Sequence, residues 1–128
     1  MSDETALAEF ITHRLDEWEA IARAAGWNGE AEPWCIDMEG NVQACDTHGA
    51  GSAYVACGPY GCGVDPSHAA HIALHDPARV LRQVEAMRKI LAECDEWMTA
   101  YAPTGAHRIL LALAAVWSDH PDFRDDWR

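Results

Sequence analysis

The sequence predicts an α+β fold: an N-terminal helix, a small antiparallel three-stranded sheet, then a short helix, a long helix and a C-terminal helix packed together. Three observations support this prediction. Apolar residues recur every three or four positions over long stretches at both ends of the chain. Three short strand-like runs separated by glycine-rich turns occupy the middle. The 128 residues, 49% of them hydrophobic, suffice for one core, so we expect a single domain over residues 1–128.

The first helix is expected over residues 3–25. Ser2 is suited to cap it, and Gly26 is suited to end it. Its apolar stripe consists of Leu7, Phe10, Ile11, Leu15, Trp18, Ile21 and Ala22. The opposite face is acidic and is expected to be solvated; it carries Glu9, Asp16, Glu17 and Glu19.

The segment PWCIDMEGNVQACD predicts a hairpin, with strands over 34–37 and 42–45 and a turn around Gly40. The glycine-rich link THGAGS then leads to a third strand over 53–57. The following GPYGCGVDP is typical of a tight loop. It is not a phosphate-binding loop, because it lacks the Lys-Ser/Thr ending.

Two Asp-Pro steps mark the starts of the next two helices, expected over 66–75 and 77–101, because aspartate caps helices and proline suits their first position. In the long helix, Glu85 is spaced to pair with Arg88 and Lys89.

Pro103 is expected to end the long helix, and the last helix is expected over 106–117. The tail SDHPDFRDDWR is expected to form a short helix that lays Phe123 and Trp127 onto the body of the protein.

The charge balance restricts the partners of this protein. Acidic residues outnumber basic ones by 21 to 9, which gives a formal net charge of −12, and no basic residue lies between Arg23 and Arg79. Such a chain repels nucleic-acid phosphates and anionic lipids, so we expect no direct nucleic-acid or membrane binding and a protein partner with a basic surface. The sequence also permits a homo-oligomer.

The N-terminus lacks the features of a signal peptide, and the apolar run ILLALAAVW is too short to span a bilayer. Five cysteines, an odd number, favour reduced thiols. We therefore expect a cytoplasmic protein.

One cluster of residues has the spacing of a zinc site: Cys57, Cys62, His71 and His75. Histidines four residues apart share a helix face, and two thiolates with two imidazoles complete a tetrahedral site. Two alternatives stay open. The histidines and Asp76 would simply mark the boundary between two helices, or Cys62 would be a nucleophile with His71 or His75 as its base. The acidic surroundings disfavour the thiolate that this catalytic alternative requires, so an enzyme is the less favoured interpretation.

Four pieces of the chain carry a resemblance: LDEWEAIARAA, the PW at 33–34, HIALHDPARVLRQVEAMRKIL and SDHPDFRDDWR. In these pieces the sequence resembles an uncharacterised family of small actinobacterial and actinophage proteins, described only as a domain of unknown function. The resemblance implies a shared fold and no assigned activity. It also implies counterparts of His71, His75, Asp76, Pro77 and Arg79 without thiols at 57 and 62. It thus favours a helix boundary at HDPARVL, with Asp76 as cap and Pro77 at the first helical position.

The preferred functional hypothesis is a small acidic module that binds another protein, with a possible phage association implied by the resemblance. One alternative is a zinc-binding protein or metal-dependent enzyme at the Cys/His cluster. Another is a DNA mimic that inhibits a nucleic-acid-binding protein of the host, which the excess of carboxylates permits.

Overall fold

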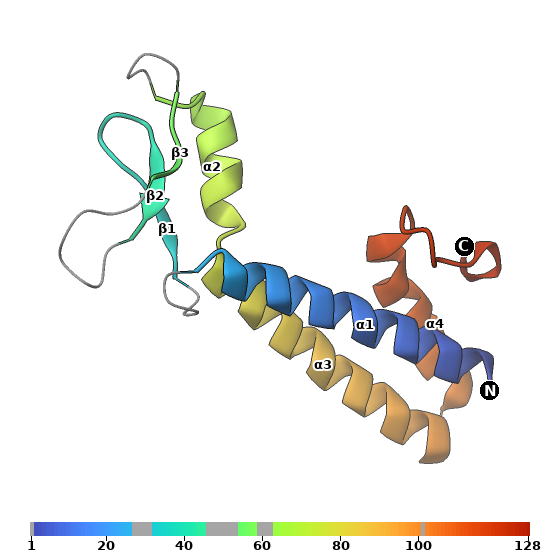
Figure 1. The fold of residues 1–128 in the computed structure, drawn as a ribbon. Helices are drawn as coiled ribbons and strands as arrows, with labels where there is room; N and C mark the ends of the chain where they lie inside the picture. Colours follow the sequence, from blue (N-terminus) through green and yellow to red (C-terminus); the bar gives the residue numbers. More distant parts are fainter. Residues whose placement is uncertain (1, 27–31, 46–53, 59–62, 101) are drawn as a thin grey trace. The chain divides into compact units, whose positions relative to one another are not determined.

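The computed structural model describes residues 2–26, 32–45, 54–58, 63–100 and 102–128. The described chain forms helices and a small sheet (Figure 1), which confirms the predicted α+β class. In chain order the elements are α1 (Asp3–Ala24), β1 (Trp34–Ile36), β2 (Val42–Ala44), β3 (Tyr54–Ala56), α2 (Pro66–Leu74), α3 (Pro77–Ala100), α4 (Pro103–Ala114) and the 3₁₀ turns η2 (Ala115–Trp117) and η3 (Asp125–Trp127).

The chain divides into two compact units. Unit 1 comprises Met1–Glu19 and Gln83–Arg128, and unit 2 comprises Ala20–Arg82. Helices α1 and α3 therefore each contribute residues to both units.

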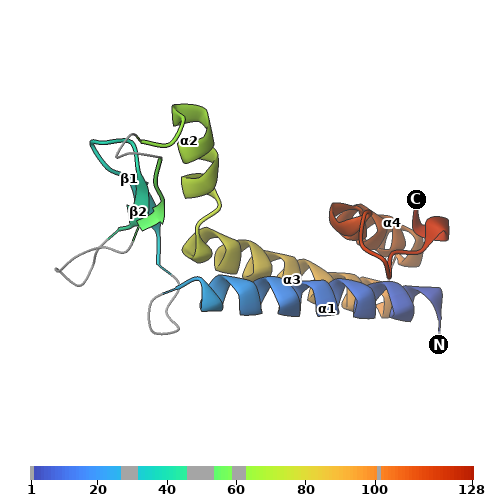
Figure 2. The same cartoon turned by 45° about the horizontal axis from the view of Figure 1, so that its top comes forward.

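Unit 1 is built on an antiparallel pair of helices. Figures 1 and 2 both show α1 and α3 running side by side in opposite directions. Most of the predicted stripe of α1 forms the core: Leu7, Ile11 and Leu15 are fully buried, whereas Ile21 is 67% exposed, contrary to the prediction. Burial of one such side chain contributes about 1.5–3 kcal/mol. The other helices of unit 1 also contribute buried side chains, namely Val84, Cys94, Ala106, Leu110 and Ala114.

One arginine bridges the two long helices of unit 1. Nη2 of Arg88 lies 2.7 Å from Oδ1 of Asp16 and 3.2 Å from Oε2 of Glu19. The expected pair of Lys89 with Glu85 is present at 3.2 Å. Arg88, however, binds α1 rather than Glu85, because the acidic face of α1 passes within its reach.

The predicted packing of the tail is confirmed, although its predicted helix is not. Phe123 and Trp127 are buried, and their rings lie 5.8 Å and 5.2 Å from that of Phe10. The tail contains only turns and η3, since most of its charged residues prefer solvent and only a few side chains hold it against unit 1.

The last helix begins earlier than predicted. Pro103 starts α4 at its first position, where a missing N–H costs nothing, instead of merely ending α3. The helix then tightens into η2 at Ala115–Trp117.

Unit 2 contains the sheet, in the order β1-β2-β3 with both pairs antiparallel. Gly40 in the first turn has φ +83°, which glycine adopts readily. The segment before α2 crosses this turn closely: a Cβ at Gly63 would lie 2.3 Å from the carbonyl oxygen of Glu39. The N–H of Val64 donates to the carbonyl of Gly40 at 3.1 Å, which fixes the crossing.

Helix α2 lies beside the sheet within unit 2 (Figures 1 and 2) and follows the predicted capping chemistry. The Asp65 carboxylate accepts a hydrogen bond from the N–H of Ser67 at 2.9 Å, and Pro66 is the first helical residue. His75 is the C-cap, and its N–H donates to the carbonyl of Ile72.

Candidate functional site

Three of the four predicted zinc ligands lie in the described part of unit 2. Cys57 is exposed just after β3. His71 and His75 are exposed at the end of α2, and their ring centroids are 4.5 Å apart, as expected for one helix face. Cys62 lies outside the described residues. Among the described residues, no group of three or more His, Cys, Asp or Glu side chains is placed to hold a metal ion. The zinc site stays a prediction.

The helix boundary at HDPARVL is confirmed. Asp76 is buried, and its Oδ1 accepts a hydrogen bond from the N–H of Arg79 at 2.7 Å, as expected of the cap of α3. Its Oδ2 accepts from the N–H of Trp34 at 3.2 Å. One carboxylate therefore starts α3 and holds β1 against that start. Through these hydrogen bonds of Asp76, the HDPARVL motif serves the fold of unit 2. The side chain of Arg79 is exposed.

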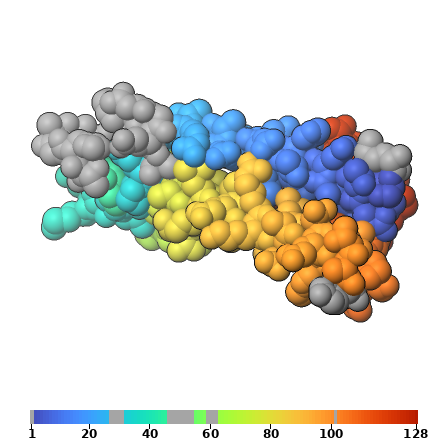
Figure 3. Space-filling model, turned by 90° about the horizontal axis from the view of Figure 1, so that it is seen from below, coloured from blue at the N-terminus to red at the C-terminus, as the bar shows by residue number. Residues whose placement is uncertain are grey.

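Unit 1 contains a groove of about 410 Å³ between the N-terminal half of α1 and the C-terminal half of α3. Figure 3 shows the side chains of these two segments next to one another, in blue and orange. Apolar atoms make up most of the lining, contributed by Ala8, Leu91, Met98 and Leu110. The remaining lining residues are polar: Ser2, Glu4, Thr5, Glu9, Thr12, His13, Asp95 and Thr99.

The groove is acidic. Three carboxylates line it, and none of its lining residues is lysine or arginine. Oε1 of Glu4 lies 3.8 Å from Nδ1 of His107. Within the described part of the chain, the carboxylates of Glu9 and Asp95 form no ion pair. Both are exposed, so they are available to a cation from outside.

The N-terminal end of α1 is capped by the residue that precedes it. Oγ of Ser2 accepts a hydrogen bond from the N–H of Thr5 at 3.2 Å, which confirms Ser2 as the cap. This cap positions Glu4 and Thr5 at one end of the groove.

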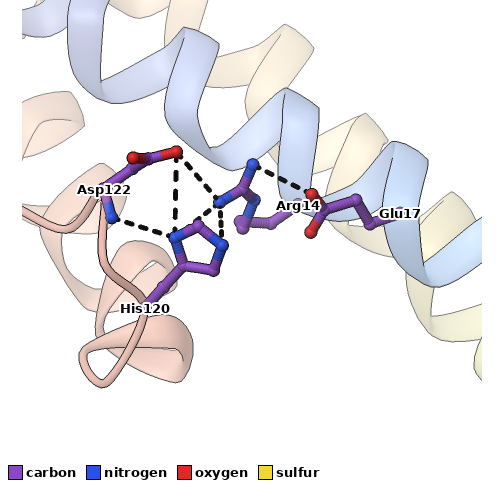
Figure 4. Close-up of polar contacts among 4 residues, drawn as sticks. All are labelled: Arg14, Glu17, His120 and Asp122. Atoms are coloured by element: carbon purple, nitrogen blue, oxygen red, sulfur yellow. Dashed lines mark hydrogen bonds and ion pairs between the residues drawn. The ribbon is translucent and has the colours of Figure 1, made fainter.

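A second polar cluster in unit 1 was not predicted. It joins Arg14 and Glu17 of α1 to His120 and Asp122 of the tail, as Figure 4 shows. The Arg14 side chain is only 7% exposed; its Nη1 lies 2.6 Å from Nδ1 of His120 and also contacts Nε2. The guanidinium further lies 3.1 Å from Glu17 and 3.7 Å from Asp122.

This cluster is a structural clamp. A guanidinium only donates hydrogen bonds, so the His120 ring accepts, and Nδ1 also accepts from the N–H of Asp122 at 3.1 Å. Because only 7% of the Arg14 side chain is exposed, its guanidinium is largely closed to solvent. The sequence did carry one signal: Arg14 falls on the apolar stripe, where a charge must find partners.

The described residues thus define a small α+β protein with an acidic interhelical groove and a clamped C-terminal tail. The chain belongs to DUF6221, a family of unknown function, whose family model matches residues 4–128. No curated protein and no solved structure matches the chain. A search of the described helices found none with the length and apolar character required to cross a membrane.

Proposed function

We propose that this protein is an acidic, cytoplasmic interaction module that binds a basic segment of a partner protein in the groove of unit 1. The observation that carries the proposal is the composition of the groove: an apolar lining bordered by Glu4, Glu9 and Asp95, without lysine or arginine.

Charge complementarity favours a cationic occupant. The formal net charge of −12 attracts basic partners over a distance, and the unpaired carboxylates of Glu9 and Asp95 supply local contacts. Leu91 and Met98, both half-buried, offer apolar contact between them. Methionine adapts its shape to different partners, which suits a binding surface.

The proposed occupant is therefore an amphipathic helix that has leucine-type anchors on one face and lysine or arginine beside them. Such helices bind in grooves between helices through anchors spaced by three or four residues. A nucleic-acid strand does not fit this groove, because phosphates would face carboxylates.

The test uses the full chain and a synthetic helix with leucines at i, i+3, i+4 and i+7 and lysines elsewhere. A peptide of equal composition in scrambled order is the control ligand. Calorimetric titration gives the affinity of each peptide at low and at high salt. The proposal predicts that the patterned peptide binds more tightly and that added salt weakens its binding. Equal binding of both peptides would contradict it.

Two double variants of equal net charge distinguish the contribution of the groove carboxylates to binding from that of the net charge of the protein. Glu9→Gln/Asp95→Asn and Asp119→Asn/Asp126→Asn each remove two negative charges, and only the first pair lies in the groove. Loss of two exposed ion pairs at roughly 0.2–1 kcal/mol each raises Kd about 2- to 30-fold. The tail variant is expected to retain the wild-type Kd. An equal loss of peptide affinity in both double variants would show that binding depends only on the net charge of the protein.

The alternatives have separate tests. Metal analysis of purified protein tests the zinc hypothesis: stoichiometric zinc that is lost in His71→Ala would support it, and a metal-free, stable protein would end it. Salt-sensitive competition with DNA for a basic DNA-binding protein tests the mimic hypothesis.

A further inference from the structure

The sheet of unit 2 places two cysteines on one face. Cys35 of β1 pairs directly with Gln43 of β2, so these two side chains lie on the same face. Side chains alternate along a strand, and Cys45 therefore shares that face two residues further on. The N–H of Cys45 donates to the carbonyl of Pro33 at 2.8 Å, which extends the same register to Cys45.

The two thiols are free, and both cysteines are half-buried on neighbouring strands. Cys35 is also among the causes that raise the pKa of the Cys45 thiol. Diagonal neighbours across two antiparallel strands lie about 7–8 Å apart, beyond the Cα separations that disulfides usually bridge, so closure requires the two strands to shift. Disulfides of this kind are readily reduced again.

We propose that Cys35 and Cys45 form a reversible dithiol–disulfide site that exchanges with low-molecular-weight disulfides. This inference does not depend on the groove of unit 1.

The two sulfurs have different roles. Burial, the hydrogen bond with Cys35 and the negative charges of Cys35 and Asp76 raise the pKa of the Cys45 thiol to about 11. A raised pKa disfavours the Cys45 thiolate, so Cys35 is assigned the attack on the small disulfide and Cys45 the resolving step.

The reaction is balanced with the small disulfide RSSR as oxidant. The Cys35 thiolate attacks one sulfur of RSSR, forms a mixed disulfide and releases RS⁻. Cys45 then passes its proton to the released RS⁻ and attacks the Cys35 sulfur, which forms the protein disulfide and releases a second RS⁻ that takes up the proton lost by Cys35. The protein loses two electrons and two protons, and RSSR becomes two RSH.

The full chain is tested in glutathione buffers of increasing oxidised fraction, quenched with acid, alkylated and digested with a protease that cleaves before aspartate. Cleavage before Asp37, Asp46 and Asp95 places Cys35, Cys45 and Cys94 in separate peptides. The main oxidised product is expected to be the linked pair of Cys35 and Cys45 peptides. The exposed Cys57 is expected to carry only glutathione, and the buried Cys94 is expected to stay reduced.

Variants assign the roles. Cys45→Ser is expected to accumulate a glutathione adduct at Cys35, whereas the control Cys57→Ser leaves the linked product unchanged. Two results would overturn the proposal. In one, Cys35 and Cys45 stay reduced under conditions that modify Cys57. In the other, both acquire glutathione and no linked peptide forms. The wild-type measurement decides the matter even if a variant fails to fold.

Discussion

Nη1 of Arg14 lies 2.6 Å from Nδ1 of His120, although the two residues are 106 positions apart in the sequence. The contact joins the middle of α1 to the C-terminal tail within unit 1. Together with the rings of Phe123 and Trp127 on Phe10, it holds the tail against the helix that lines the groove.

Replacement of His120 by alanine tests this clamp. His120→Ala removes an acceptor from a buried guanidinium, which costs about 1–3 kcal/mol of unfolding free energy. The measurement is urea unfolding followed by tryptophan fluorescence. His13→Ala is the control, because His13 is exposed and its loss is expected to change stability by less than about 0.5 kcal/mol. Equal effects of the two substitutions would show that the clamp contributes nothing.

Asp76 is expected to matter through both of its oxygens. Asp76→Ala removes the cap of α3, worth about 0.5–2 kcal/mol, and leaves the N–H of Trp34 without its acceptor. Asp76→Asn keeps an oxygen that caps helices well, so its loss of unfolding free energy is expected to be smaller. Chemical unfolding of the two variants shows which of them loses more unfolding free energy. An alanine variant as stable as wild type would contradict the capping role.

Two glycines are expected to respond oppositely to alanine. Gly63→Ala forces the Glu39 carbonyl to move and is expected to cost about 1–3 kcal/mol, in the range of overpacked sites. Gly105→Ala, inside α4 with its nearest neighbour at 3.9 Å, is expected to stabilise by about 0.4–1 kcal/mol. Thermal unfolding of both variants shows whether each substitution lowers or raises the stability. A neutral Gly63→Ala would disprove the close crossing in unit 2.

Asp65 gives a prediction for pH. The hydroxyl and the backbone N–H of Ser67 donate to its carboxylate and lower the pKa of Asp65 below the ordinary value of 3.8. Because the folded pKa is the lower one, the stabilisation is complete above 3.8 and is lost as the pH falls through the folded pKa. Carboxyl-carbon NMR titration measures the midpoint, with urea-unfolded protein as reference.

Ser67→Ala is the matching variant for this titration. It removes the hydroxyl donor but keeps the backbone donor, so the Asp65 pKa is expected to rise part of the way toward 3.8. An unchanged midpoint in this variant would show that the hydroxyl does not contribute.

The elements of the fold that depend on local chemistry were predictable. The Asp-Pro steps at 65–66 and 76–77 predict two helix starts, because a helix cap depends on the residues next to it. Gly40 predicts the hairpin turn, because glycine readily adopts a positive φ angle. Pro103 was predicted to end the long helix, but it is the first residue of α4. A proline suits both positions, so the sequence alone does not distinguish them.

The long-range contacts were not predictable. Arg14 falls on the buried face of α1, but nothing in the sequence identifies His120 as its partner. The groove likewise arises only when α1 and α3 lie antiparallel, which brings Glu9 and Asp95 into one lining. Such pairings depend on tertiary packing, and helical periodicity reports only which face of each helix is buried.

The most direct test of the proposed function is to locate a bound peptide on the protein. Isotope-labelled full chain is titrated with the leucine-lysine helix, and backbone amide shifts are followed by NMR. The account predicts that the largest saturable shifts fall on α1 and α3 residues of the groove, including Ala8, Glu9 and Asp95. Shifts confined to the tail or to unit 2, or small shifts spread over every acidic surface, would contradict it.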